Sequence, residues 1–464
     1  MKIKSVPNRW IYEDGLRLDC GPYMSGAMEA RKILEDLSVP KQELRELTAG
    51  HDGGIYNGPQ FRRTYVDSKD YGVPFLGSSS VLAADLSNLP LLSNKDAHSA
   101  KLSHLKLSEG TTLITCSGTI GRMAYARSEM EGMWTSQHVL KVVPDRSKIL
   151  PGYLYAYLSS KFGVPLVTSG TYGAIIQHIE PHHIAQLPVP RLASTTEKEI
   201  HILVNEAAVL RAEASKKKAE VIIRTESRLN WNQLGLHSLS NTVSSSKLNR
   251  RFDGFYHSLS IDLARTSLSS TPKTTFLGKI TREIFEPNRG ARVKADSALH
   301  GVPFLSSSEV FRLDPTGEYF ISKKMPHYER FLIEESDLLL PRSGQIGGII
   351  GHAVLPLPTN YGHAASDHLV RIRCHTCEQA YYLWAIFATQ PGYYAAIGTA
   401  FGTSIPSLDC ELLSQLEIPL FEEDFRQDIV MAVTQMVSNL TEAIRKERAA
   451  TKILENSIEL LEAA

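Results

Sequence analysis

The chain has 464 residues, equal numbers of acidic and basic residues, and a hydrophobic content of 42%. This composition is ordinary for a soluble globular protein, and the length is enough for two to four domains. No apolar run approaches the ~18 residues that a membrane-spanning helix needs, and the first residues lack the apolar core of a signal peptide. Five scattered cysteines predict a reducing compartment, so we expect a cytoplasmic protein without a membrane partner. A neutral chain can still carry a basic face, so the net charge does not exclude a nucleic-acid partner.

The part of the chain before residue 191 is predicted to mix strands and helices. Short β-prone segments bounded by turn residues predict strands at 74–76, 113–115, 123–126 and 138–143. The sequence SGTIG, which ends at Gly121, predicts a tight turn between the second and the third of them. A short amphipathic helix is expected at 152–160 and a proline-containing strand at 187–190.

A long helix is predicted from 197 to 228, because neither Gly nor Pro occurs between Arg191 and Leu234. Apolar or small residues recur three or four positions apart along much of it, at Ile200, Leu203, Ala207, Leu210, Ala214 and Val221. That spacing is typical of a helix that packs lengthwise against another helix. At a rise of ~1.5 Å per residue, the helix would be roughly 50 Å long.

A second long helix is predicted after Pro419, where Gly and Pro are again absent. Its apolar positions keep the same spacing, at Val430, Val433, Val437, Leu440, Ile444, Leu454, Ile458 and Leu461. Two such helices in one chain most economically pair with each other as an antiparallel coiled coil. The alternative is that each helix packs only on its own domain.

The sequence repeats itself at an offset of about 229 residues. YGVPFLGSSSV from Tyr71 is matched by HGVPFLSSSEV from His300, and SQHVLKV is matched by SDHLVRI. LITCSGTIG, ending at Gly121, is matched by LLLPRSGQIG, ending at Gly347, and LPVP is matched by LEIP. The ordered blocks, followed each time by a long helix, indicate a tandem duplication.

The duplication predicts an α+β fold with two similar mixed α/β domains, joined by two long antiparallel helices with pseudo-two-fold symmetry. The predicted segments are a first domain at 1–193, a central long helix at 194–235, a Ser-rich linker at 236–247, a second domain at 248–420 and a C-terminal long helix at 421–464.

The ordered set of blocks resembles one protein family. The order GVPFL, SGTIG or SGQIG, a Ser-x-His strand, a short aromatic helix, a Gly-containing segment, LPVP and a long helix is similar to that of the specificity subunit of Type I restriction–modification systems. Two RxD…Y patterns also fit, one at Arg17, Asp19 and Tyr23 and one at Arg251, Asp253 and Tyr256. The resemblance covers nearly the whole chain, in both copies.

The resemblance implies that each globular domain is a target-recognition domain that reads half of a gapped, bipartite site in double-stranded DNA. It implies that the paired helices set the gap and that two DNA methyltransferase subunits dock on the chain. Whether a restriction–translocation subunit also joins is left open. A subunit of this family performs no chemistry and needs no cofactor.

The candidate DNA contacts are basic, polar or aromatic residues that can neutralise phosphates or bond to base edges. They are Arg62, Arg63, Tyr65, Lys69, Asn94, Lys95, Thr119 and Arg122 in the first copy, and Arg289, Arg292, Lys294, Arg312, Lys323, Lys324, Arg342 and Gln345 in the second. Residues that repeat between the copies are expected to be scaffold, and the dissimilar stretches 82–110 and 311–330 are expected to read sequence. The alternatives are a solvated surface and, for the SGxxG turns, a structural hairpin.

A second group of residues is expected to pack against the helices or a partner subunit. Its members are Tyr172, Gln177, Thr403 and Ser404 in the Gly-containing segments, and Leu203, Leu210, Val437, Leu440 and Ile444 on the helices. Cys374 and Cys377 have CxxC spacing, but no second such pair accompanies them, so no metal site is expected.

Two other classes of function remain as alternatives. An adenine methyltransferase would need a glycine-rich cofactor loop and an Asn/Asp-Pro-Pro-aromatic motif, and neither occurs in the sequence. No GxxxxGK[ST] phosphate loop or convincing cluster of nuclease carboxylates is present either. The remaining alternative is a coiled-coil adaptor that binds only proteins.

Overall fold

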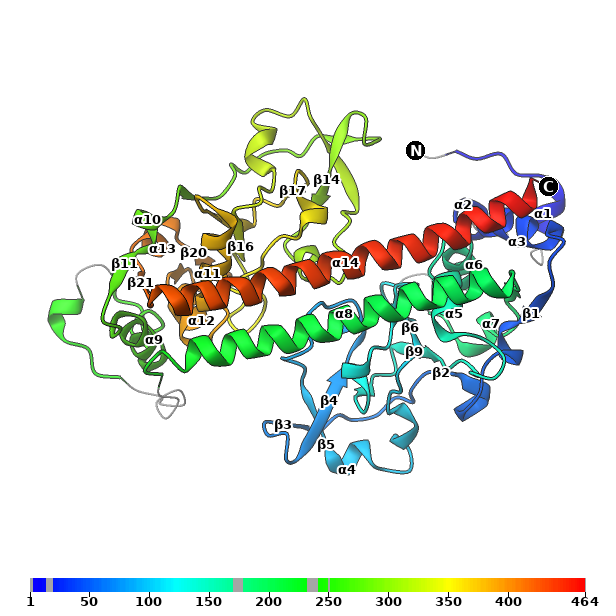
Figure 1. The fold of residues 1–464 in the computed structure, drawn as a ribbon, viewed down its shortest axis with the longest axis horizontal. Helices are drawn as coiled ribbons and strands as arrows, with labels where there is room; N and C mark the ends of the chain where they lie inside the picture. The colour runs from blue at the N-terminus through cyan, green and yellow to red at the C-terminus, as the bar shows by residue number, and fades with distance from the viewer. Residues whose placement is uncertain (1–2, 14–19, 170–177, 232–240, 249–250, 464) are drawn as a thin grey trace. The chain divides into compact units, whose positions relative to one another are not determined.

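The computed structural model describes residues 3–13, 20–169, 178–231, 241–248 and 251–463. The chain divides into two compact units: unit 1 consists of Met1–Ala212 and Glu442–Ala464, and unit 2 of Glu213–Thr441. Both units contain helices and sheets, so the fold is mixed α/β (Figure 1). None of the described helices has the length and apolar character needed to cross a membrane.

Unit 1 is built from short helices and three small sheets. Its described helices are α1 (Asn8–Glu13), α2 (Gly21–Met24), α3 (Ala27–Asp36), α4 (Asn94–Ala97), α5 (Pro151–Leu158), α6 (Gly163–Ser169) and α7 (Pro181–Ile184). Its strands are β1 (Lys41–Glu43), β2 (Ile55–Tyr56), β3 (Tyr65–Val66), β4 (Gly72–Leu76), β5 (Leu91–Ser93), β6 (Thr112–Thr115), β7 (Met123–Tyr125), β8 (Trp134–Thr135), β9 (Val139–Val142) and β10 (Pro188–Pro190). The sheet orders are β1-β10, β2-β9-β6-β7 and β3-β5-β4-β8.

Unit 2 has the same kinds of element. Its described helices are α9 (Leu259–Ser269), α10 (Leu277–Ile280), α11 (Cys377–Phe387), α12 (Gln390–Ile397) and α13 (Cys410–Ser414). Its strands are β11 (Thr274–Phe276), β12 (Glu283–Phe285), β13 (Lys294–Ala295), β14 (Gly301–Leu305), β15 (Tyr319–Ser322), β16 (Asp337–Pro341), β17 (Ala364–Ala365), β18 (Leu369–Arg373), β19 (Ala400–Phe401), β20 (Ser407–Leu408) and β21 (Glu417–Pro419). The sheet orders are β11-β21, β12-β18-β16, β13-β15-β14-β17 and β19-β20.

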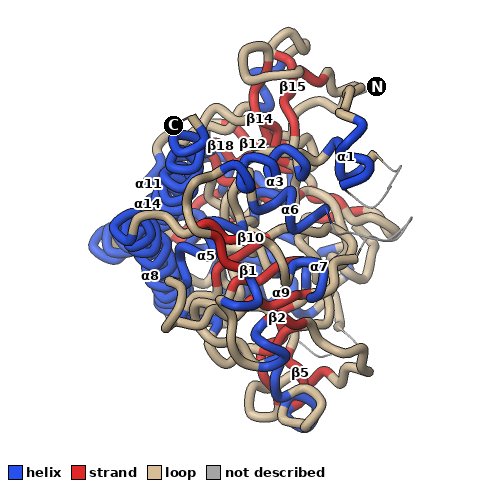
Figure 2. The backbone as a smooth tube through the Cα atoms, turned by 90° about the vertical axis from the view of Figure 1, so that its right-hand side faces the viewer, coloured by secondary structure: helices blue, strands red, loops and turns tan. Residues whose placement is uncertain are grey.

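The sheets of the two units have matching internal orders. β13-β15-β14-β17 corresponds to β3-β5-β4-β8, including a parallel pair at the end: Phe75 is opposite Trp134 in unit 1, and Phe304 is opposite Ala364 in unit 2. The antiparallel pairs β1-β10 and β11-β21 join an early strand of each unit to the strand that precedes its long helix. Figure 2 shows β1 beside β10.

Two long helices are present, α8 (Ser194–Glu226) with 33 residues and α14 (Glu423–Glu462) with 40. Each is divided between the units, because its two parts bury their apolar residues in different cores. In unit 1 Ile200 of α8 and Leu454 of α14 belong to one core, and in unit 2 Val221 and Val433 belong to another. α8 and α14 lie side by side in Figure 1 and Figure 2.

Within unit 2 the parts of α8 and α14 run antiparallel. Asn439 donates a hydrogen bond to Glu213 at 3.1 Å, and Arg224 bonds to Asp428 at 3.2 Å. The residue number therefore rises along α8 as it falls along α14. In unit 1 the two helices are joined by Arg211 and Glu447, whose closest nitrogen and oxygen atoms are 2.5 Å apart.

The short helices after β9 and β18 differ from the prediction. The sequence predicted amphipathic helices at 152–160 and 379–389, but α5 is buried on nearly every side and α11 on most of its length. The reason is that α5 lies in the same core as Ile200 and Val204 of α8, and α11 in the same core as Val433 of α14. A helix covered in this way has no exposed polar face.

The SGTIG turn in unit 1 has the predicted hairpin form, joining β6 to β7. Gly121 has a φ of +75° and donates its backbone N–H to the carbonyl of Thr115 at 2.9 Å. A Cβ atom on Gly121 would lie 2.4 Å from the Cγ2 atom of Thr168 in α6. Both the left-handed backbone and the close approach therefore require glycine at this position.

In unit 2 the residue in the equivalent place is Gly351, and not Gly347 as the sequence blocks suggested. Gly351 has a φ of +76° and donates its N–H to the carbonyl of Pro341 at 3.0 Å. A Cβ atom there would lie 2.5 Å from the Cγ2 atom of Ile397 in α12. The second turn is therefore longer than the first, and its extra residues at 345–349 are exposed.

Candidate nucleic-acid interface

In unit 1 a cationic and aromatic cluster lies over the sheet β3-β5-β4-β8. Its centre is Phe75 of β4, which is 2% exposed. The Arg63 guanidinium carbon is 5.4 Å from the centre of the Phe75 ring, and the rings of Phe61 and Tyr65 meet Phe75 edge-on. Arg63 also donates a hydrogen bond to the side-chain oxygen of Gln137 at 2.9 Å. The segment before β3 thus covers Phe75 and holds one arginine between an aromatic ring and a neutral amide.

Unit 2 has a corresponding cluster over the sheet β13-β15-β14-β17. Phe304 of β14 is 1% exposed, and the Arg292 guanidinium carbon lies 4.7 Å from the centre of its ring. Tyr319 stacks on Phe304 with 5.1 Å between the ring centres, and the Lys294 ammonium is 4.4 Å from the centre of the Tyr319 ring. Here the arginine pairs with a carboxylate, since Arg292 donates to Asp367 at 2.5 Å.

The pairing in unit 2 shifts the pKa of both partners. Burial by itself raises the pKa of Asp367, but the bond from Arg292 reverses this and leaves the pKa below its usual value. Burial likewise lowers the pKa of Arg292, and the bonds to Asp367 and Tyr319 leave it raised. The two charges therefore persist together and compensate each other.

Most of the other basic residues predicted in these two regions are on the surface. Arg62, Lys69, Lys95, Arg289, Lys323 and Lys324 are exposed, as are Thr119 and Gln345 in the turns. Asn94 is half-buried at the start of α4 and donates to the carbonyl of Asp70 at 3.1 Å. Asn94 therefore helps to fix a loop beside β4.

Three predicted arginines have internal partners. Arg312 pairs with Glu309 at 3.1 Å and with Glu318 at 3.3 Å. Arg342 is 9% exposed and forms an ion pair with Glu286 beneath the turn that follows β16. Arg122 is half-buried, and its backbone N–H donates to the hydroxyl of Thr115 at 3.1 Å. An arginine held as Arg342 is supports the turn and is not presented to a base.

The helix residues predicted to pack do so within their units. Val437 and Ile444 are buried, and Leu203, Leu210 and Leu440 are partly buried. Thr403 and Ser404 are exposed. Tyr172 and Gln177 lie outside the described residues, as do Arg17 and Asp19.

Two residues that matter in these clusters were missed by the sequence reasoning. Gln137 and Asp367 are the middle residues of the repeated Ser-x-His blocks, and they decide the partner of the arginine in each unit. The signal was available, because the Ser and the His recur while the residue between them changes from neutral to acidic.

Each unit also buries a cation in the strand after that block. Lys141 is 0% exposed, donates to the carbonyl of Val139 at 3.3 Å and lies 5.0 Å from the centre of the Tyr56 ring. Burial lowers the pKa of Lys141 to about 7. Arg371 in unit 2 is also 0% exposed, but it donates to four backbone carbonyls, those of Phe331, Ala365, Ser366 and Leu369. These cations are structural, because neither reaches solvent.

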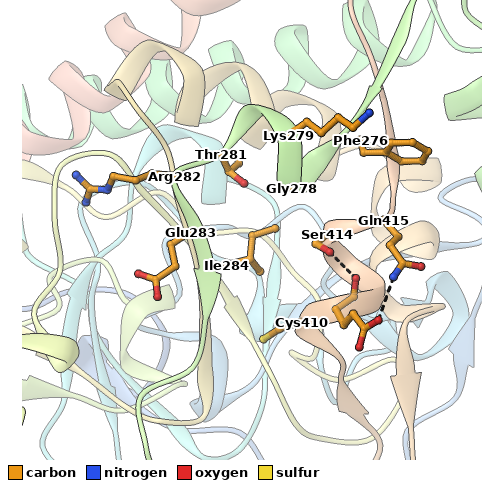
Figure 3. Close-up of a pocket in the computed structure, with 11 residues that line it drawn as sticks. Phe276, Gly278, Lys279, Thr281, Arg282, Glu283, Ile284, Cys410, Ser414 and Gln415 are labelled. Carbon is orange, nitrogen blue, oxygen red and sulfur yellow. Dashed lines mark hydrogen bonds between the residues drawn. The ribbon is translucent and has the colours of Figure 1, made fainter.

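Unit 2 has one sizeable cavity, of about 740 Å³, between α10, β12 and α13 (Figure 3). Its charged residues already have partners: Arg282 pairs with Glu334, and Glu283 pairs with Arg330 at 2.7 Å. The Lys279 ammonium lies 5.2 Å from the centre of the Phe276 ring. We assign this cavity no ligand, because its guanidinium and carboxylate groups satisfy each other.

No protein-family model and no curated protein matches the chain. Among solved structures, the chain is similar to the S subunit of a Type-I restriction-modification system from M. genitalium, with 11% identity, 92% of this chain and 96% of that chain covered, and a TM-score of 0.34. The HsdS subunit from Thermoanaerobacter tengcongensis has 14% identity, 90% and 96% coverage and a TM-score of 0.27. A structure concerned with complex assembly and conformational transition of the type I R-M system has 12% identity, 91% and 98% coverage and a TM-score of 0.27.

These structures agree with the resemblance seen in the sequence, since they too are specificity subunits of Type I systems. Their TM-scores are below 0.5, so this chain's function has to be inferred from its own residues.

Proposed function

We propose that the protein is a DNA sequence-specificity subunit that recognises a gapped, bipartite target and positions methyltransferase subunits on it. The observation that carries this proposal is the paired construction of the chain. Two units share one strand order, and each holds an arginine against a buried phenylalanine of the equivalent sheet, Arg63 on Phe75 and Arg292 on Phe304. A duplicated reader is what a split target requires, because each half-site then meets a similar surface with different side chains.

We propose 1–193 and 248–420 as the two target-recognition domains. The candidate contacts with bases and phosphates are the exposed residues near the two clusters and turns, together with the two cluster arginines. In unit 1 these are Arg62, Lys69, Lys95 and Thr119, and in unit 2 Arg289, Lys294, Lys323, Lys324 and Gln345. Arg342 and Arg312 are assigned a supporting role, because acidic neighbours already neutralise them.

The long helices serve as the spacer in this proposal. At a rise of ~1.5 Å per residue, the 33 residues of α8 and the 40 of α14 correspond to rods of roughly 50 and 60 Å. One turn of B-DNA is ~34 Å, so an antiparallel pair of such helices can hold two readers at sites one turn or more apart. The gap in the target then follows from helix length.

The partners are double-stranded DNA and two DNA methyltransferase subunits, with a restriction–translocation subunit joining in a complete restriction system. The chain supplies recognition and performs no chemistry itself. A protein-only adaptor would not require a repeated cationic and aromatic cluster on equivalent sheets.

The proposal is tested by mapping methylated adenines in a host that expresses this chain with the methyltransferase subunit encoded beside it. We expect one gapped motif with two specific halves. Changing Lys323 and Lys324 together to Ala should weaken methylation of the same motif, whereas the unmethylated host without the chain is the blank. A contiguous motif, or no motif despite a soluble complex, would falsify the proposal.

A further inference from the structure

The Ser-x-His block places a side chain against the same arginine in both units. Arg63 and Arg292 are 229 positions apart, as are Phe75 and Phe304 on which they lie. The middle residue of the block is Gln137 in unit 1, and it accepts a hydrogen bond from Arg63 at 2.9 Å.

In unit 2 the middle residue of the block is an aspartate. Arg292 donates to Asp367 at 2.5 Å, and the side chains are 34% and 10% exposed respectively. The charge difference between the two clusters is therefore one full unit. Arg63 keeps its positive charge, while Arg292 and Asp367 together carry none.

The charge matters because both arginines are accessible at the surface that the proposed function assigns to DNA. Each phosphate neutralised by a protein cation releases condensed counterions, which makes the affinity depend on salt. A guanidinium already neutralised by a carboxylate at 2.5 Å contributes little to that release. The phenylalanine beneath each arginine fixes its position, so the neighbour in the Ser-x-His block determines its availability.

We infer that residues 137 and 367 are positioning residues that set how strongly each unit holds the DNA backbone: Gln137 leaves Arg63 as a phosphate-binding cation, and Asp367 withdraws Arg292 from that role. The inference rests on the proposed function and assigns an unequal electrostatic share to the two half-sites. Unit 1 holds DNA through Arg63, and unit 2 depends on its other exposed cations, Lys294 among them.

The test uses the full chain and a mixed-sequence double-stranded DNA, with the binding constant measured over a series of salt concentrations. Arg63→Gln should lower the slope of log K against log salt by ~0.9, the contribution of one phosphate contact. Gln137→Glu, which is nearly isosteric and adds a carboxylate beside Arg63, should lower the slope equally. Gln137→Asn is the matched neutral control and should leave the slope unchanged.

The second unit supplies the opposite change. Asp367→Asn should raise the slope by ~0.9 and tighten binding at low salt, because it releases the charge of Arg292. Arg292→Gln should leave the slope as in the wild type, although it lowers the unfolding midpoint by stranding Asp367. A purely structural role for these residues would move the unfolding midpoint and not the slope.

The outcomes separate the inference from the proposed function. If the wild type binds DNA with a salt-dependent slope but Gln137→Glu and Asp367→Asn leave that slope unchanged, the inference is wrong and the proposed function stands. If Arg292→Gln lowers the slope as much as Arg63→Gln does, the inference is also wrong. If the wild type shows no salt-dependent binding at all, both are overturned. Should Gln137→Glu fail to fold, Asp367→Asn decides alone, since it removes a charge.

Discussion

Lys141 shows how one residue can link stability to pH in this protein. Its ammonium group is fully buried in unit 1 and has a pKa of about 7, whereas an exposed lysine has a pKa of about 10.5. Between these two values the unfolded chain binds a proton that the folded chain does not. Stability must therefore rise with pH over this window and be lowest below pH 7, where the charge stays buried.

We predict that Lys141→Met removes this pH dependence from unit 1. The stabilisation should be largest at pH 6, up to ~5 kcal/mol by the size of the pKa shift, and should fade toward pH 10. The buried neighbours do not compete over this range, because burial raises the pKa of Tyr56 and raises that of Cys116 to about 11. Hydrogen exchange of β9 and β6 amides at several pH values measures the effect. Equal stabilisation at pH 6 and pH 10 would contradict the prediction.

At the scale of elements, the contact between α8 and α14 in unit 1 combines one buried and one exposed ion pair. The Arg211 side chain is 2% exposed and pairs with Glu447, which is 21% exposed. Lys446 and Glu206 form a second pair at 2.8 Å, with side chains 25% and 48% exposed. Removing one partner of a buried pair leaves an uncompensated charge, whereas an exposed pair contributes little.

We predict that Arg211→Ala destabilises the packing of α8 on α14 by about 3 kcal/mol, toward the lower end for a buried pair because Glu447 keeps some contact with water. Lys446→Ala, on the same helix contact, should cost less than about 1 kcal/mol. Native-state hydrogen exchange of the α8 amides compares the two variants. Equal effects would mean that burial does not decide the strength of this contact.

At the scale of the whole molecule, the proposed spacer makes the gap in the DNA target depend on helix length. The two units are divided between Ala212 and Glu213 in α8 and between Thr441 and Glu442 in α14. Residues inserted at these points leave the internal contacts of each unit intact. A seven-residue insertion keeps the apolar seam in register, because that seam repeats every ~3.5 residues.

We predict that inserting seven residues at both points widens the gap in the methylated motif without changing its two specific halves. The added helix is ~10 Å long, which corresponds to about three base pairs. Methylation mapping reads out the gap directly. An insertion in α8 alone mismatches the two helices and should abolish methylation, which is the control. An unchanged gap after the double insertion would show that the helices do not set it.

The sequence by itself determined the elements that depend on local pattern and on repetition. Long runs without Gly or Pro and with three-four apolar spacing are enough to specify α8 and α14. The strands at 74–76, 113–115 and 138–143 were predictable because β-prone residues lie between turn residues, and they correspond to β4, β6 and β9. The repeat was visible because its blocks keep their order.

Only the tertiary structure decided what depends on residues far apart in the chain. Arg63 and Gln137 are 74 positions apart, and no periodicity links them, so their hydrogen bond and its charged counterpart in unit 2 could not be read from sequence. Gly351 takes the place of Gly121 because α12 approaches the backbone there, although Gly347 matches better in the sequence. The burial of α5 and Arg342 likewise follows from what packs around them. Sequence pattern fixes the local backbone, but the partner of a side chain is fixed by packing between distant segments.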